Sequence, residues 1–94
     1  MDRQAFVDQV KARLESWNAQ IDKLEEQARQ AEAESRARIQ DQLEDLRRQR
    51  DRAEEKLQDM RTVSDRAWRD MGKGFEDAWG AIEDSFHRAA KRFD

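Results

Sequence analysis

The sequence predicts an all-α protein built from a long amphipathic helix, and three observations lead to this prediction. The 94-residue chain is rich in Ala, Arg, Glu, Gln and Leu, which favour helices, and 44% of its residues are charged. It has no proline and only three glycines, so it lacks the turn residues that regularly spaced strands need. Its apolar residues recur every three or four positions. The pattern indicates a coiled coil or a helical bundle, with a helical hairpin as the alternative.

We expect a single helical domain over residues 1–94. Residues 1–71 are predicted as a coiled-coil segment with a change of phase near residues 35–43, and residues 72–94 as an amphipathic, aromatic-rich C-terminal helix. The absence of cysteine excludes disulfides and thiolate metal sites. With 19 basic and 22 acidic residues the net charge is −3, which does not favour nucleic acid as a partner.

The first zone of the chain, from Val7 to Ser35, repeats its apolar residues at alternating spacings of three and four. Such a seven-residue repeat, apolar at its first and fourth positions, is typical of a coiled coil. Toward Ala28 and Ala31 the side chains on this seam become small. The predicted oligomer seam of the whole coiled-coil segment comprises Val7, Val10, Leu14, Trp17, Ile21, Leu24, Ile39, Leu43, Leu46, Leu57, Met60 and Met71.

The second zone begins with a change of phase, because Ser35, Ile39 and Leu43 are spaced four and four. This spacing is a stutter, which locally unwinds a coiled coil. The residues around it, 30–38, are rich in Ala, Glu and Arg and are predicted as helix rather than loop. Further on, Arg50 occupies a seam position. A charged residue there can fix register, but we favour a long side chain that extends out of the seam.

The third zone follows a period of eleven residues, in which Ala67-Trp68 recurs as Ala78-Trp79 and more weakly as Ala89-Ala90. Eleven residues make three helical turns, so the apolar stripe runs nearly straight along its helix. This stripe is either the wider core of a bundle, which we favour, or a surface for binding lipid. The predicted C-terminal interaction face comprises Val63, Trp68, Phe75, Trp79, Ile82, Phe86 and Phe93.

All three glycines lie in this zone. Gly72 and Gly74 flank Lys73, and each glycine lowers helix stability by about 1 kcal/mol relative to alanine. We therefore predict a bend at Gly72–Gly74 in an otherwise continuous helix. The alternative hairpin would fold either near Glu34–Arg38 or at these glycines.

No group of residues favours catalysis or a cofactor. His87 is the only histidine, and with Glu83 and Asp84 it would form only a weak set of metal ligands on one exposed helix. No serine has a histidine within a local helical pairing, and Gly72-Lys73-Gly74 is too short for a phosphate loop. We predict a protein that is not an enzyme and that takes no metal, cofactor or small-molecule substrate.

The chain has no apolar run of the roughly 20 residues that a membrane span needs, and its first residues carry Asp2, Arg3 and Asp8 instead of the apolar core of a signal peptide. We therefore expect a cytoplasmic protein.

A helix with an apolar face has to bury that face against something. The main hypothesis is a scaffold or protein–protein interaction protein that forms a homo-oligomer through the seam; a helix of another protein would fit the same seam. The alternative is an amphitropic protein that coats a lipid or granule surface with its C-terminal helix. Acidic and basic residues nearly balance in that helix, so anionic lipid is not favoured.

The repeat of Ala67-Trp68 as Ala78-Trp79, preceded by Ile21-Asp22-Lys23-Leu24-Glu25 upstream, resembles small bacterial coiled-coil proteins with C-terminal Ala-Trp repeats of eleven residues. The resemblance implies a helical cytoplasmic protein and carries over no catalytic residue. The C-terminal repeat is also similar, more weakly, to that of phasins, which coat polyester storage granules.

Overall fold

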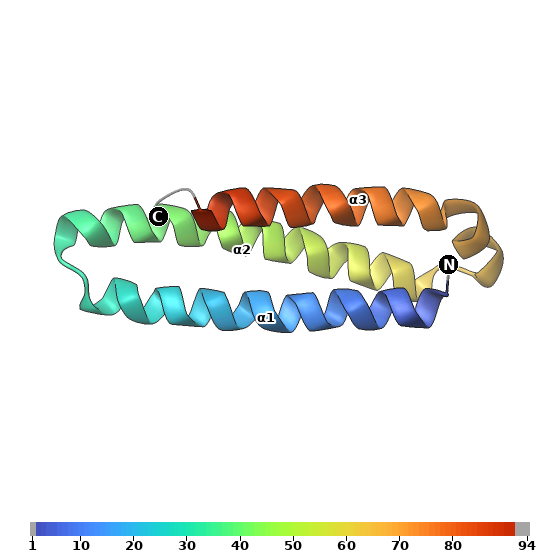
Figure 1. The fold of residues 1–94 in the computed structure, drawn as a ribbon, viewed down its shortest axis with the longest axis horizontal. Helices are drawn as coiled ribbons and strands as arrows, with labels where there is room; N and C mark the ends of the chain where they lie inside the picture. Colours follow the sequence, from blue (N-terminus) through green and yellow to red (C-terminus); the bar gives the residue numbers. More distant parts are fainter. Residues whose placement is uncertain (1, 92–94) are drawn as a thin grey trace.

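The structure is a computed structural model that describes residues 2–91, and these residues form three α-helices packed side by side in an antiparallel bundle (Figure 1). The helices are α1 (Arg3–Gln30), α2 (Ala33–Thr62) and α3 (Asp65–Lys91). The bundle measures 52 × 17 × 16 Å. The all-α prediction is confirmed. The structure does not confirm the favoured single long helix and agrees with the alternative of a hairpin or bundle, because the chain reverses its direction twice and buries its apolar faces against one another.

Each reversal takes two residues, and neither contains glycine or proline. Ala31 and Glu32 connect α1 to α2 with extended backbone angles. The prediction of helix across residues 30–38 is therefore wrong. Burial of α2 against α1 outweighs the local preference for helix, because helix propensities are small compared with the burial of a whole helix face.

At the second reversal, which consists of Val63 and Ser64, the sequence contains a residue that caps the N-terminus of α3. The Ser64 hydroxyl accepts a hydrogen bond from the Ala67 backbone N–H at 3.1 Å, as an N-cap residue does. The first reversal differs, because no side chain caps the N-terminus of α2 at Glu32.

The predicted bend at Gly72–Gly74 is wrong. α3 runs without interruption from Asp65 to Lys91, and no described glycine has a positive φ. Two glycines are not enough to break a helix whose other face is buried, because the packing of that face supplies more stability than the glycines remove.

The carbonyl groups at the end of each helix are bonded by a side chain from a different helix. Arg36 of α2 donates to the carbonyls of Ala28 and Ala31 at the end of α1. Arg3 of α1 donates to the Val63 carbonyl after α2, at 2.9 Å. At the end of α3, Gln42 Nε2 donates to the carbonyls of Ala89 at 3.1 Å and Ala90 at 2.8 Å. These bonds satisfy carbonyls that have no partner within their own helix, and they fix the register of the helices.

Aromatic rings fill the space between α1 and α3, whose backbones approach closely at few points. Trp17 stacks on Trp79 and on Phe86, with ring centroids 5.1 and 4.1 Å apart. Toward the other end of the bundle, Phe6 lies against Trp68 at 6.0 Å. The aromatic stripe of the C-terminal zone is thus part of the bundle core.

Candidate interaction surface along α1 and α2

Most residues of the predicted seam are buried, and the helices that bury them belong to the same chain. The buried members are Val7, Val10, Leu14, Trp17, Ile21, Leu43, Leu46 and Met60, and the partly buried ones are Leu24, Ile39 and Leu57. Met71 is the exception, with 49% of its surface exposed. α3 turns Trp68, Gly72 and Phe75 inward, so Met71 lies beside the buried face instead of on it.

The predicted C-terminal face is also part of the core. Trp68, Phe75, Trp79, Ile82 and Phe86 are buried, and Val63 packs against them from the turn. Phe93 lies outside the described residues. Phe6 and Gln42 are buried but were not among the predicted residues, and Gly72, predicted only as part of a bend, is buried as well. Phe6 could have been found from its position four residues before Val10, whereas nothing in the sequence distinguishes Gln42 from the exposed glutamines.

The apolar faces of α1 and α2 keep the same helical phase across the turn that separates them. Val10 and Leu46, Trp17 and Ala53, and Ile21 and Leu57 are each 36 residues apart. Thirty-six residues correspond to about ten turns of α-helix at 3.6 residues per turn. If the chain were straight from Arg3 to Thr62, these residues would therefore line one continuous face. A hairpin does not require this match, because each of its helices can turn its own face toward the other.

A small set of contacts closes the α1–α2 turn. The Ala31 N–H donates to the Ala28 carbonyl at 3.4 Å. Arg36 adds two hydrogen bonds, from Nε to the Ala28 carbonyl at 3.2 Å and from Nη2 to the Ala31 carbonyl at 3.0 Å. A straight helix would replace these contacts by its regular backbone hydrogen bonds. Straightening the turn would therefore break few hydrogen bonds without replacing them.

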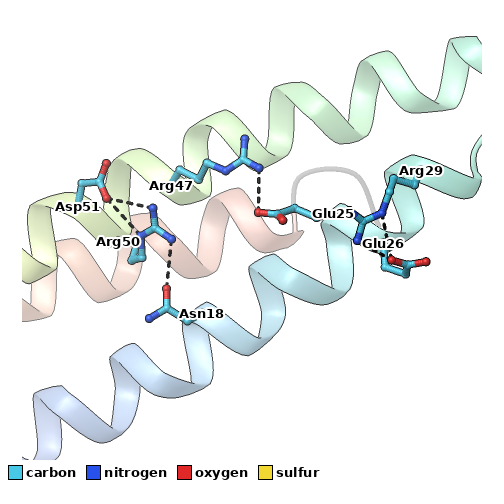
Figure 2. A network of polar contacts seen from close by, with 7 residues as sticks. All are labelled: Asn18, Glu25, Glu26, Arg29, Arg47, Arg50 and Asp51. Carbon is cyan, nitrogen blue, oxygen red and sulfur yellow. Dashed lines mark hydrogen bonds and ion pairs between the residues drawn. The ribbon is translucent and has the colours of Figure 1, made fainter.

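Two polar links join α1 to α2 further along the hairpin (Figure 2). Arg47 donates to the Glu25 carboxylate at 2.8 Å, and Arg50 donates to the Asn18 side-chain oxygen at 3.2 Å. Arg50 also bonds the Asp51 carboxylate, and a quarter of its side chain is exposed. Arg50 thus extends from its seam position toward polar groups, as we interpreted from the sequence. Both links join α1 to α2.

The Glu26–Arg29 pair in Figure 2 lies within α1 and joins no other helix. The hydrogen bond and the positive charge of Arg29 hold the pKa of the Glu26 carboxyl below its ordinary value of 4.5. The pair is fully exposed, so its contribution is to the last turn of α1 and not to the core.

A shallow groove of about 480 Å³ lies between α1 and α2 near the turn. Arg29, Arg36 and Arg47 line it, and their guanidinium groups bond to carboxylates or carbonyls of the protein itself. On α3, His87 is exposed beside Asp84 and Arg88. Within residues 2–91, no three His, Cys, Asp or Glu side chains come together in a way that could hold a metal ion. None of the helices described is both long and apolar enough to cross a membrane.

The chain matches no protein-family model, no curated protein and no solved structure. The resemblance to small bacterial coiled-coil proteins and to phasins therefore stays a prediction.

Proposed function

We propose that this protein is a non-enzymatic scaffold that acts by self-association, in which two copies exchange helices through the α1–α2 turn. Ala31 and Glu32 become helical, and α1 and α2 of one chain form a single helix from Arg3 to Thr62. At 1.5 Å per residue this helix is about 90 Å long. Each α1 then packs against α2 and α3 of the other chain, so the dimer holds two bundles end to end with two-fold symmetry.

The match in phase between α1 and α2 carries this proposal. In the exchanged dimer two long helices lie antiparallel, and their apolar faces meet along the whole length only if α1 and α2 share one phase. Trp17 and Ala53, at 36 residues apart, satisfy this condition. Short hinges made of residues that favour the open conformation promote such exchange.

The closed and exchanged forms bury the same residues and differ chiefly at the hinge. The link from Arg47 to Glu25 and the link from Arg50 to Asn18 persist in either form, between helices of one chain or of two. Among the hydrogen bonds of residues 2–91 described above, the three around Ala31 are lost. The equilibrium therefore depends on protein concentration and on the hinge residues.

Glu32 has a φ of −67°, which is the value that proline adopts. Ala31 before it has the extended conformation that a residue preceding proline prefers. Glu32→Pro is compatible with the turn but destabilises a continuous helix by about 3 kcal/mol. In each chain this lowers the equilibrium constant for straightening the turn by about a hundredfold. We expect the wild-type chain to form dimers in sedimentation velocity after refolding at high concentration, and Glu32→Pro to remain monomeric.

Glu32→Ala is the matched control, because it removes the same carboxylate while favouring helix, and it should dimerise at least as tightly as the wild type. A second experiment introduces Glu25→Cys and Arg47→Cys and joins the two cysteines with a short bismaleimide. The exchanged form then gives covalent dimers, because the two cysteines that meet belong to different chains. The closed form gives monomers with an internal link. A wild-type chain that stays monomeric at every concentration contradicts self-association itself. Dimers of Glu32→Pro as tight as those of the wild type contradict the exchange at this hinge.

A further inference from the structure

The buried face of α3 has the composition of a helix that binds at a lipid surface. It combines four large aromatic residues with Ile82 and the small residues Gly72 and Ala89, and it is flanked by charged residues. Trp68 and Trp79, and Phe75 and Phe86, are each eleven residues apart, so the aromatic stripe runs nearly parallel to the helix axis. A straight stripe can meet a flat surface along its whole length, which a strongly twisted one cannot.

Polar contacts attach α3 to the other two helices near both of its ends and once between them, and Arg3 also lies over the Trp68 ring, 5.7 Å from its centroid. Gln42 bonds its last carbonyls, and Arg3 pairs with Asp65 at 2.9 Å near its first turn. Between these ends, Arg13 lies 3.5 Å from Glu83. α3 also contains all three glycines of the chain, which lower its intrinsic helix stability below that of α1 and α2. The place of α3 in the bundle therefore depends on the packing of its buried face more than on its own helix propensity.

One buried group in this face lacks the partner that its chemistry requires. Trp79 is only 4% exposed, and its indole N–H donates to no acceptor. One helical turn later, a buried carboxylate oxygen of Glu83 accepts no hydrogen bond but pairs with the Arg13 guanidinium at 3.5 Å, so the Trp79 indole N–H is the group left without a partner. A buried donor without an acceptor destabilises the closed bundle. At a lipid–water boundary the indole ring is in apolar surroundings while its N–H reaches water or a headgroup.

We propose that α3 detaches from the α1–α2 hairpin and binds the surface of an uncharged phospholipid bilayer through the face that runs from Trp68 to Phe86. The helix then lies in the plane of the interface, with its charged side in water. α3 has five basic and six acidic residues, so the attraction comes from the burial of aromatic rings and not from anionic headgroups. Highly curved vesicles, whose headgroups are less tightly packed, are the favoured target.

The test uses the full chain, which has no cysteine of its own, with Arg13→Cys and Glu83→Cys joined by a bismaleimide that contains a cleavable disulfide. This link ties α3 to α1 at a site where the native side chains are 3.5 Å apart. Sonicated phosphatidylcholine vesicles with brominated acyl chains quench tryptophans that enter the bilayer. We expect at least a twofold loss of tryptophan emission for the unlinked variant, little loss for the linked one, and recovery of quenching after cleavage.

The matched control links Glu25→Cys to Arg47→Cys, which ties α1 to α2 and leaves α3 free to move. This variant should be quenched as strongly as the wild type, and circular dichroism confirms that each linked variant is folded. Raising the salt concentration should change the vesicle affinity by less than twofold. Equal quenching of the linked and unlinked Arg13/Glu83 variants would overturn the proposal, as would the absence of quenching in the wild type or binding that requires anionic lipid.

Discussion

Gln42 illustrates how a single polar side chain positions a helix. It is buried with 6% of its surface exposed, and its amide bonds two carbonyls at the end of α3. Buried polar side chains are rare unless their hydrogen bonds are satisfied, and the carbonyls at a helix end need partners from outside the helix. Gln42 meets both requirements at once, so it ties the end of α3 to α2.

Replacing Gln42 with leucine should lower the free energy of unfolding by about 1–2 kcal/mol, because two carbonyls lose their donor. Urea denaturation measures this loss. Gln40→Leu is the control, since Gln40 is exposed on the same helix and its replacement should change stability by less than about 0.5 kcal/mol. Equal effects of the two substitutions would mean that the Gln42 hydrogen bonds contribute nothing to stability.

At the scale of the helix, the glycines of α3 are a local weakness that packing overrides. A Cβ added at Gly74 would have no atom within 4 Å, and the backbone there is already helical. Gly74→Ala should therefore raise the free energy of unfolding by about 0.5–1 kcal/mol, through helix propensity and a more restricted unfolded chain. Thermal unfolding followed by circular dichroism detects the change.

Gly72 provides the comparison for this substitution. A Cβ at Gly72 would lie 3.8 Å from the Trp68 ring, an ordinary van der Waals distance, so Gly72→Ala should also be tolerated. A marked loss of stability in Gly74→Ala would indicate that α3 needs a flexible backbone at this position in solution.

At the scale of the whole molecule, the aromatic stack around Trp17 joins the two helices whose backbones are furthest apart. Trp17 is 2% exposed and contacts Trp79 and Phe86 of α3. Because α1 and α3 meet mainly through these rings, the bundle should unfold as one cooperative unit when no lipid is present. Unfolding curves from tryptophan fluorescence and from far-UV circular dichroism should therefore coincide.

Trp17→Ala should remove about 3–5 kcal/mol of stability, a large part of the 5–15 kcal/mol typical of a small domain. Chemical denaturation measures this loss, with Ser16→Ala as the control on the exposed side of the same helix. A stable, cooperatively folded Trp17→Ala variant would show that α1 and α3 are held together by contacts other than this stack.

Composition and periodicity were sufficient to predict helix and the buried face of each helix. The spacing of Val10, Leu14, Trp17 and Ile21 predicted a buried face, and the structure buries all four. The alternative hairpin placed a fold at Glu34–Arg38, close to the observed turn, but the favoured prediction there was helix, because Ala31 and Glu32 favour helix in any short segment. The same periodic face can be buried within one chain or between two, and its residues are identical in both cases.

Only the tertiary structure decided which groups meet. It brought Gln42 to the end of α3, Arg3 to the turn after α2, and Trp17 against Phe86, all through contacts between residues far apart in the sequence. A seven-residue pattern determines which side of a helix is apolar, because that depends on the helix period alone. It does not determine which helix covers that side, because the burial of apolar surface has no direction and many arrangements satisfy it.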